Sequence, residues 1–462
     1  MASKTMRMTE GSLGKSILLF SLPLMLSNLL QILFTISDVA VVGRFAGSLA
    51  LGAVGSTTTL VMLFTGFLVG LGAGVNVLVA RFVGARDEKN THETVHTAAV
   101  LCLLIGFVMM GLGQLLAKPL LTILGTKADL MDGALLYLRI YFLGMPALAM
   151  FNFGNAVLSA VGDTKRPLFF LTSAGFLNVG LNLLFVIAFH MDVEGVALAS
   201  IIAQYVSAIL TVGFLFRSHG THTLRLRHLR IHTDKAIRIL ALGIPSGFQN
   251  AIFHIANLFI QAAVNSFDTI TVAGNAAAAN ADGLVYDMMA AFYTACASFM
   301  SQNFGAGKRN RILKSYFISL AYAFTLGAVL GGLLLIFGEQ FLSLFSKDDP
   351  AVIEAGLQRL TVMGITYCVS AFMDCSIAAS RGIGKTLWPT VIVIMGSCVF
   401  RVIWVYTVFA YFHTIPSLYL LYVFSWSITA IAEIFYFAHS YRKRMKLFDA
   451  KDPKGEAPVP TI

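Results

Sequence analysis

Long apolar runs without a charged residue recur along this chain and constrain its fold more than any other feature. Residues 16–37, 97–117 and 315–338 are examples. A helix needs about 20 mostly apolar residues to cross the hydrocarbon core of a bilayer, which is roughly 30 Å thick. Only 12% of the residues are charged, against about 25% in an average soluble domain, so a soluble fold would lack a polar surface. The sequence therefore predicts an all-α membrane protein.

Twelve transmembrane helices in two pseudo-symmetric six-helix bundles account for these runs. The longest polar stretch, residues 217–236, is basic and lies near the middle of the chain. We expect an N-terminal lobe at 1–216, a cytoplasmic linker at 217–236, a C-terminal lobe at 237–441 and a basic, disordered cytoplasmic tail at 442–462. The predicted helices are 15–42, 50–83, 95–117, 136–161, 167–190, 195–216, 237–264, 271–303, 315–342, 358–380, 386–412 and 416–441.

The basic residues predict the orientation of these helices. Most of the 33 Lys and Arg residues fall in loops that a twelve-helix arrangement places on one side of the membrane. Loops rich in Lys and Arg face the cytoplasm, so we expect both termini to be cytoplasmic in a multi-pass protein of the bacterial inner membrane. The net charge of +10 then reflects topology and contact with membrane lipids. We expect no nucleic-acid partner, and a monomer.

Two sequence anchors recur in the second half of the chain. GDTKRP at 162–167 recurs as GKTLWP at 384–389, and Pro23 and Asn28 recur as Pro245 and Asn250, in both cases 222 positions later. Repeats of this parallel kind indicate two lobes around a central path, as in transporters that work by alternating access. The alternative is an inherited scaffold without a transport role.

Predicted helices 1 and 7 each carry a polar stripe on one face. The spacings of three and four residues place its members together: Asn28, Gln31, Thr35 and Asp38 in the first, and Asn250, His254, Asn257, Gln261 and Asn265 in the second. Polar groups are costly against lipid, so we expect them to face a water-filled cavity or to hydrogen-bond neighbouring helices. The predicted substrate cavity adds Asn152, Asp282, Tyr286 and Asp287.

Asp38 is the only carboxylate in the membrane part of the N-terminal lobe. Asn178 and Asn182 share one face of predicted helix 5, and with Asp38 they could form one polar nest. Amide oxygens can coordinate a small cation but cannot carry a proton, so H⁺ would be held by Asp38 alone and Na⁺ by Asp38, Asn178 and Asn182 together. The alternative is a hydrated aspartate that merely ends the helix.

The C-terminal lobe has its own ionisable residues within predicted helices. An unpaired charge in hydrocarbon is costly, so we expect Arg401 to form a structural ion pair, with Asp374 as its partner and Asp282 or Asp287 as alternatives.

No sequence pattern predicts an enzyme or an energy-coupling ATPase. The chain contains no HExxH, no Walker A loop and no GxSxG, so we expect no catalytic residue and no cofactor. Transport would have to use an ion gradient.

Several segments resemble the multidrug and toxic compound extrusion (MATE) family over about residues 12–441. They are SDVAVVGRFAG at 37–47, ARFVGARDEKN at 80–90, SAVGDTKRP at 159–167, SQNFGAGKRN at 301–310 and SRGIGKTLWP at 380–389. The resemblance implies a proton- or sodium-coupled antiporter that exports drug-like, cationic organic molecules.

The resemblance also carries over particular residues, in the pattern of the DinF-like branch. The helix-1 aspartate of the family falls on Asp38, its helix-5 Asn-x-x-x-Asp pair on Asn178 and Asn182, and its helix-6 hydroxyl on Ser200. The second acid is thus an amide here. A flippase for lipids or lipid-linked precursors is the alternative within the superfamily, and a membrane scaffold or receptor without transport is the alternative of another class.

Overall fold

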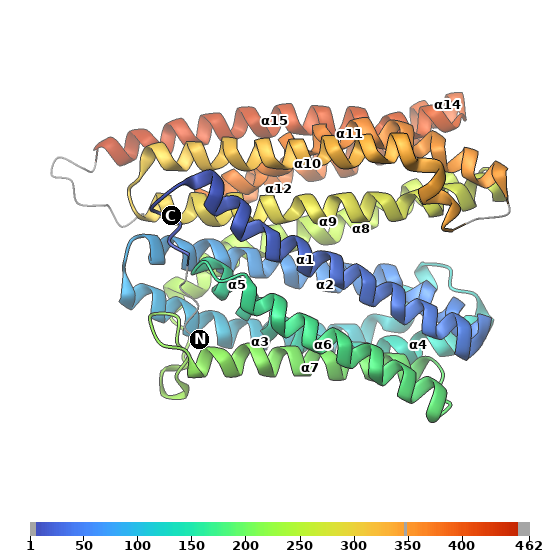
Figure 1. Ribbon diagram of the computed structural model, residues 1–462, viewed down its shortest axis with the longest axis horizontal. Coiled ribbons are helices and arrows are strands. Elements are labelled where there is room, and N and C mark those ends of the chain that lie inside the picture. The colour runs from blue at the N-terminus through green and yellow to red at the C-terminus, as the bar shows by residue number, and fades with distance from the viewer. Residues whose placement is uncertain (1–5, 346–348, 451–462) are drawn as a thin grey trace. The chain divides into compact units, whose positions relative to one another are not determined.

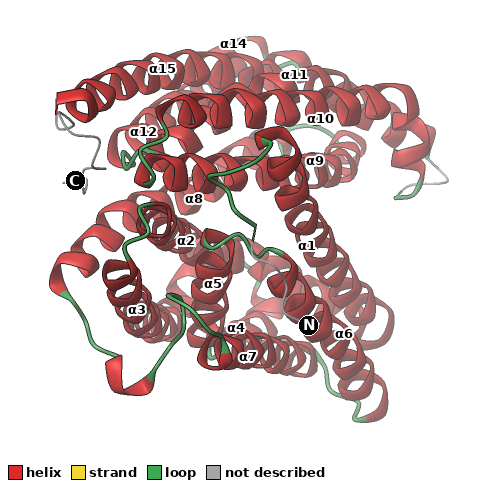
Figure 2. Ribbon diagram, turned by 60° about the vertical axis from the view of Figure 1, so that its left-hand side comes forward, coloured by secondary structure: helices red, strands yellow, loops and turns green. Residues whose placement is uncertain are grey.

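The protein is almost entirely helical. The computed structural model describes residues 6–345 and 349–450, and these ranges contain helices joined by loops and no strand (Figures 1 and 2). The last helix, α15 (Ile415–Ala450), continues past the predicted end at 441. The tail was therefore predicted to begin too early, because residues 442–450 contain no helix breaker; its remainder at 451–462 lies outside the described residues.

The predicted twelve transmembrane helices are present. Among the described residues, nine continuous helical stretches are long and apolar enough to cross a membrane, or ten with the bent pair α4 (Ala128–Phe142) and α5 (Met145–Ala160) taken as one span. One stretch, Leu13–Gly84, holds two helices, α1 (Leu13–Val41) and α2 (Gly47–Gly84). Gly47 separates them with a φ of +91°, a conformation that favours glycine. The more polar α9 (Thr269–Gly305) is the twelfth.

The remaining spans complete the order along the chain. They are α3 (Glu88–Ile123), α6 (Lys165–Leu183) with the π-helical turn η2 (Leu184–Ala188), α7 (Val193–Arg217), α8 (Thr233–Val264), α10 (Arg309–Ser343) and α11 (Pro350–Gly382). The eleventh span is a run of short α- and π-helical pieces from α12 (Leu387–Val393) to α14 (Ala410–Phe412). Predicted helix 4 differs from the structure, because the chain bends by 48° between α4 and α5, where Pro146 lies in the first turn of the second helix.

The chain divides into two compact units. One comprises Met1–Met6 and Leu26–Ala251, and the other Arg7–Met25 and Ile252–Ile462. The division differs from the predicted lobes, since the first half of α1 belongs to the second unit and the first half of α8 to the first. Each changeover follows a proline inside the helix, Pro23 or Pro245. Proline removes a backbone hydrogen bond and kinks a helix at such a point.

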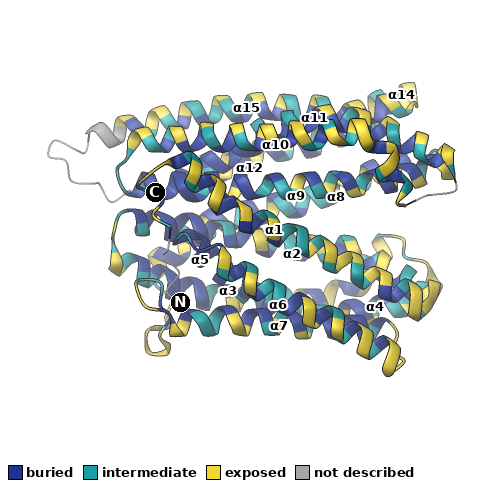
Figure 3. Cartoon of the chain, in the orientation of Figure 1, coloured by how far each residue is buried: buried dark blue, intermediate teal, exposed yellow. Residues whose placement is uncertain are grey.

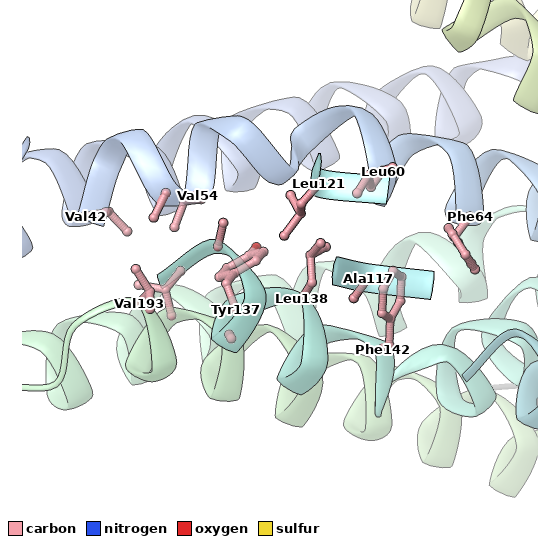
Figure 4. Close-up of a cluster of buried hydrophobic side chains, with 14 of the residues drawn as sticks. Val42, Val54, Leu60, Phe64, Ala117, Leu121, Tyr137, Leu138, Phe142 and Val193 are labelled. Carbon is pink, nitrogen blue, oxygen red and sulfur yellow. The ribbon is translucent and has the colours of Figure 1, made fainter. Parts of the chain in front are cut away.

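The core of the first unit lies between α2, α3, α4 and α7. Leu60 and Phe64 of α2 face Leu121 of α3 and Leu138 and Phe142 of α4 (Figure 4). The rings of Phe64 and Phe142 are 4.7 Å apart. Exposed positions are scattered along α6, α7, α10 and α15 (Figure 3), and many are large and apolar, as expected for surfaces that face lipid.

Two glycine pairs allow α2 and the first half of α8 to touch within the first unit. A Cβ atom on Gly70 would lie 2.4 Å from the backbone nitrogen of Gly247, and one on Gly74 would lie 2.5 Å from that of Gly243. Both pairs have the GxxxG spacing that permits close approach of membrane helices. The backbones of α2 and of the first half of α8 therefore pack directly against each other at these glycines, with no large side chain between them.

In the second unit, α11 is the central helix. It packs against α9, α10 and α15, and small residues along it permit close contact. A Cβ atom on Gly331 of α10 would lie 2.1 Å from the carbonyl oxygen of Gly364 of α11.

Candidate functional site: a polar ring around Asp38

Asp38, near the end of α1, closes a ring of hydrogen bonds with α6 and α7. Asn182 Nδ2 donates to Asp38 Oδ1 at 2.5 Å, and Ser200 Oγ donates to Asp38 Oδ2 at 3.5 Å. Asn182 Nδ2 also donates to Asn178 Oδ1 at 3.1 Å, and Asn178 Nδ2 donates to Ser200 Oγ at 3.4 Å. The structure therefore brings together the four residues predicted to hold a coupling cation. We refer to them as the Asp38 ring.

Local helix geometry places the members of this ring. Asn178 and Asn182 are four residues apart on α6, so their side chains stack on one face. The helices that carry Asp38 and Asn182 both widen into π-helical turns directly after the site, η1 at Val42–Ala46 and η2 at Leu184–Ala188. Turns of this kind occur frequently at functional sites. The hydropathy pattern did not predict them.

The ring is buried on the α6 and α7 side and reachable on the α1 side. Asn182 is 0% exposed, Asn178 is 6% exposed and Ser200 is 8% exposed, whereas Asp38 is only half-buried. Among the described residues, the carbonyl oxygen Asn182 Oδ1 has no hydrogen-bond donor although it is buried. A buried acceptor without a partner is costly, so this oxygen is suited to receive a donor or a cation.

The ring contains several oxygen atoms that could coordinate a cation. Small hard cations prefer carboxylate, amide and hydroxyl oxygens, and the ring offers Asp38, Asn182 Oδ1, Asn178 Oδ1 and Ser200 Oγ. Asp38 is the only member that can gain or lose a proton. The residues thus fit either Na⁺ or H⁺.

Two tyrosines that the sequence analysis did not single out lie near the ring. Tyr137 and Tyr141 of α4 are both close enough to Asp38 to interact with its charge. Their rings stack with centroids 5.9 Å apart. Tyr137 and Tyr141 are four residues apart on a predicted helix, so the sequence indicated that their rings share one face. Hydropathy alone did not indicate which neighbouring helix that face contacts.

The other predicted cavity residues of the first unit use much of their hydrogen-bonding capacity on nearby backbone. Thr35 Oγ1 donates to the carbonyl of Gln31 at 3.0 Å, and Asn152 Nδ2 donates to the carbonyl of Leu148 at 2.9 Å. Asn250 Nδ2 donates across to the carbonyl of Gly66 on α2 at 3.1 Å. Gln31 and Thr35 are exposed and Asn28 is half-buried. Of the two predicted roles, hydrogen bonding to a neighbouring helix therefore applies to Asn250. Gln31 and Thr35 are exposed and remain available to a ligand.

Asp282 in the second unit is already neutralised by an ion pair. Arg359 of α11 contacts it through two nitrogens, with Nε donating to Asp282 Oδ2 at 3.0 Å, and the hydroxyl of Tyr367 donates to Oδ1. Arg359 also donates to Asn275 of α9. Arg359 is 6% exposed, yet the sequence did not mark it as a candidate site residue. Because Arg359 lies at the beginning of predicted helix 10, the sequence did not indicate that it pairs with Asp282.

The prediction that Arg401 forms an ion pair with Asp374 is wrong. Arg401 is 2% exposed, yet within the described residues no carboxylate lies within ion-pair distance of it. Its Nε donates to Ser425 Oγ at 3.2 Å and its Nη1 to Asn257 Oδ1 at 3.4 Å. Aromatic faces replace the carboxylate, with Tyr422 nearest at 4.7 Å from the guanidinium carbon to the ring centroid. Asp374 Oδ2 is itself buried without a hydrogen-bond partner among the described residues.

The remaining predicted residues of the second unit are dispersed. Gln261 connects to Arg359 through Asn275, whose Nδ2 donates to Gln261 Oε1 at 3.4 Å. Tyr286 is exposed, and its ring lies 6.3 Å from that of Tyr293. His254 and Asp287 are half-buried.

The repeat agrees with a known family pattern. A family model described as MatE matches residues 23–184 and again residues 245–407. The two matched segments begin 222 positions apart, the offset at which the sequence anchors recur.

Curated relatives match over most of their length. A probable multidrug resistance protein, YpnP, from Bacillus subtilis is 29% identical over 344 residues, which cover 74% of this chain and 77% of the relative. A protein named FAD transporter from Shewanella oneidensis is 25% identical and is covered to 76%, with 74% of this chain. A probable multidrug resistance protein NorM from Thermotoga maritima is 23% identical, with 82% of each chain covered.

Solved structures share the fold. A MOP superfamily transporter from Pyrococcus furiosus superposes with a TM-score of 0.89 at 22% identity, covering 96% of this chain and 99% of its own. An outward-facing multidrug resistance MATE family transporter of the MOP superfamily gives a TM-score of 0.88 at 22% identity, covering 96% of this chain and all (100%) of its own.

Proposed function

This chain belongs to the MatE family of membrane transporters, and from that premise we propose that it is a secondary active antiporter. It exports small, drug-like organic cations in exchange for H⁺ or Na⁺ by alternating access. Its curated relatives are named multidrug resistance proteins, and the family consists of transporters and not of enzymes. No cofactor beyond the coupling ion is needed.

The observation that carries the proposal is the Asp38 ring. Its carboxylate is half-buried and is held from two sides by Asn182 and Ser200. Beside it lies a buried amide oxygen that has no donor in the described part of the chain. A fixed carboxylate in the membrane is a binding site for a cation. It can therefore hold either a coupling ion or a cationic substrate, and competition between the two is the basis of exchange.

Exchange follows from the charge on Asp38. When Asp38 is ionised and without an ion, it attracts a cationic substrate. Proton binding, or Na⁺ bound by Asp38, Asn178 and Asn182, removes that attraction and releases the substrate. The same event alters the hydrogen bonds that join α1 to α6 and α7, and α1 contains Pro23, a residue type at which a helix can bend. A change at the ring can thus bias the geometry of α1.

Substrate contacts are assigned to the polar stripes and to neighbouring aromatic residues. In the first unit these are Asn28, Gln31, Thr35, Asn152 and Asn250, and in the second His254, Asn257, Gln261, Tyr286 and Asp287. Aromatic faces such as Tyr286 attract organic cations. Asp282 is a weaker candidate, because Arg359 already neutralises it.

Dye efflux from proteoliposomes under separate pH and Na⁺ gradients tests this function. The wild-type protein should move ethidium against its gradient when one of the two ion gradients is imposed. Asp38→Asn keeps the shape of the side chain but removes its charge and titration, and should abolish gradient-driven efflux at equal protein abundance. Asp268→Asn, in the loop between α8 and α9, is the matched control and should retain efflux. Wild-type efflux by Asp38→Asn would reject the proposal.

A second candidate substrate class is an organic anion. Arg401 is buried, is bordered by aromatic rings, and has one nitrogen without a hydrogen-bond partner among the described residues. One relative is named FAD transporter. The same proteoliposomes should therefore also be loaded with FAD. Movement of FAD without movement of ethidium would favour this class, movement of labelled lipid would favour a flippase, and no gradient-dependent movement of any of them would favour a non-transporting scaffold.

The family and the distribution of basic residues along the chain support a proposed location. We place the protein in the bacterial inner membrane as a monomer surrounded by lipid, with both termini in the cytoplasm.

A further inference from the structure

Three histidines from distant parts of the sequence meet where α3 begins. His92 and His96 are four residues apart on the first turns of α3, and His228 belongs to the 3₁₀ turn η3 (Leu226–His228) of the linker. One ring nitrogen from each lies within 4.8 Å of the others. The ring centroids of His92 and His96 are 4.0 Å apart, and those of His92 and His228 are 5.1 Å apart. The role proposed for the Asp38 ring does not involve them.

We propose that these three histidines form a binding site for a late first-row divalent transition metal, of which Zn²⁺ is the reference ion. Two histidines at i and i+4 on one helix face are a known arrangement of metal ligands, and three protein nitrogens leave one position for water. Imidazole selects Zn²⁺, Ni²⁺ or Cu²⁺ over Mg²⁺ and Ca²⁺, which prefer oxygen.

The hydrogen bonds of the three residues determine how the ion would bind. Within the described residues, the side chains of His92 and His228 make no hydrogen bond, so their nitrogens are available. His96 is buried, with Nδ1 2.8 Å from the carbonyl of His92 and Nε2 accepting from the backbone N–H of Arg225 at 2.9 Å. Because Nδ1 is held within its own helix, Nε2 is the nitrogen that turns to the ion. Metal binding therefore releases the Arg225 amide and couples the linker to α3.

The surroundings set the expected affinity. The histidines line a pocket of about 600 Å³ whose wall also holds Glu88 and Glu93 together with Lys89 and three arginines, Arg225, Arg227 and Arg230. Glu93 lies 3.8 Å from Lys235 and 4.0 Å from His232. The excess of positive charge opposes a divalent cation. We therefore expect micromolar affinity, weaker than in closed structural zinc sites.

Isothermal titration with ZnCl₂ tests the site on the full-length protein, purified with a tag that contains no histidine. The wild type should bind one Zn²⁺ and should not bind Mg²⁺. His228→Ala, on the exposed linker, and His92→Ala should each weaken Zn²⁺ binding by at least about tenfold. His219→Ala, an exposed linker histidine outside the cluster, is the matched control and should bind as the wild type does. Unchanged elution in size exclusion verifies the fold of each variant.

Hydrogen exchange provides a second measurement that a merely adventitious surface ion would not affect. Zn²⁺ should accelerate exchange of the Arg225 amide in the wild type and not in His228→Ala. The proposal is overturned by an absence of saturable Zn²⁺ binding, by equal loss in His219→Ala, by competition from Mg²⁺, or by binding that leaves the Arg225 amide protected. Saturable binding of inorganic phosphate without Zn²⁺ binding would also overturn it, and would identify the pocket as an anion site formed by the arginines.

Discussion

Asn182 of α6 donates one amide hydrogen to Asp38 of α1, while its own carbonyl oxygen is buried and has no donor among the described residues. The same side chain therefore orients the carboxylate and supplies an empty ligand position beside it. A leucine has no amide and could do neither. The longer side chain of a glutamine would not keep its amide between Asn178 and Asp38.

Asn182→Leu should impair ion coupling more than folding. It removes a hydrogen bond to a charged group, worth about 1.5–3 kcal/mol, which corresponds to roughly tenfold or more in ion affinity. The measurement is gradient-driven ethidium efflux at equal abundance. Asn152→Leu is the matched control, because Asn152 bonds the carbonyl of its own helix, and it should have the smaller effect on efflux. Equal rates in the two variants would show that Asn182 does not support coupling.

Arg359→Met should strongly destabilise the protein. It leaves Asp282 without its cation in a buried setting, and breaking such a pair costs about 3–5 kcal/mol. We expect a lower melting temperature in detergent and lower abundance in the membrane. The double variant Arg359→Met with Asp282→Asn should recover much of the loss, since it removes both charges. If the double variant were as unstable as the sum of the two singles, the ion pair would not be the cause.

Arg401→Met should be tolerated far better than Arg359→Met. No carboxylate is paired with Arg401 among the described residues, so its removal leaves no buried charge behind, and an apolar side chain of similar volume fits a site lined by Phe253, Tyr422 and Trp426. The expected result is a melting temperature close to that of the wild type. A loss as large as that of Arg359→Met would mean that the aromatic contacts of Arg401 are essential to the fold.

The proposed topology predicts opposite labelling of two loops by a membrane-impermeant thiol reagent. In intact cells, a cysteine at Asp268, between α8 and α9, should react, while one at His219 in the linker should react only after permeabilisation. The five native cysteines are all in helices, and a parallel sample of the parent protein measures their background. Labelling of His219→Cys in intact cells would show that the orientation is the reverse of the one proposed.

The arrangement of helices was largely predictable from the sequence. Length and hydropathy of each span are properties of 20 or so consecutive residues, and the family match at two segments 222 positions apart confirmed the repeat. The sequence also predicted that Asn178 and Asn182 lie next to each other, because residues four apart share a helix face. The family resemblance supplied Ser200. The DinF-like branch and the assignment of a coupling ion stay predictions.

Only the tertiary structure decided which of these faces meet. Sequence reasoning paired Arg401 with a carboxylate because a lone charge in lipid is costly, yet aromatic rings and hydroxyls surround it and Arg359 takes Asp282 instead. It likewise could not bring His228 to His92, or Tyr137 to Asp38, since these contacts join residues far apart in the chain. Hydropathy determines whether a helix enters the membrane, because that depends on the helix alone. Its rotation and its neighbours depend on the packing of all the helices at once, which is why partners had to be read from the structure.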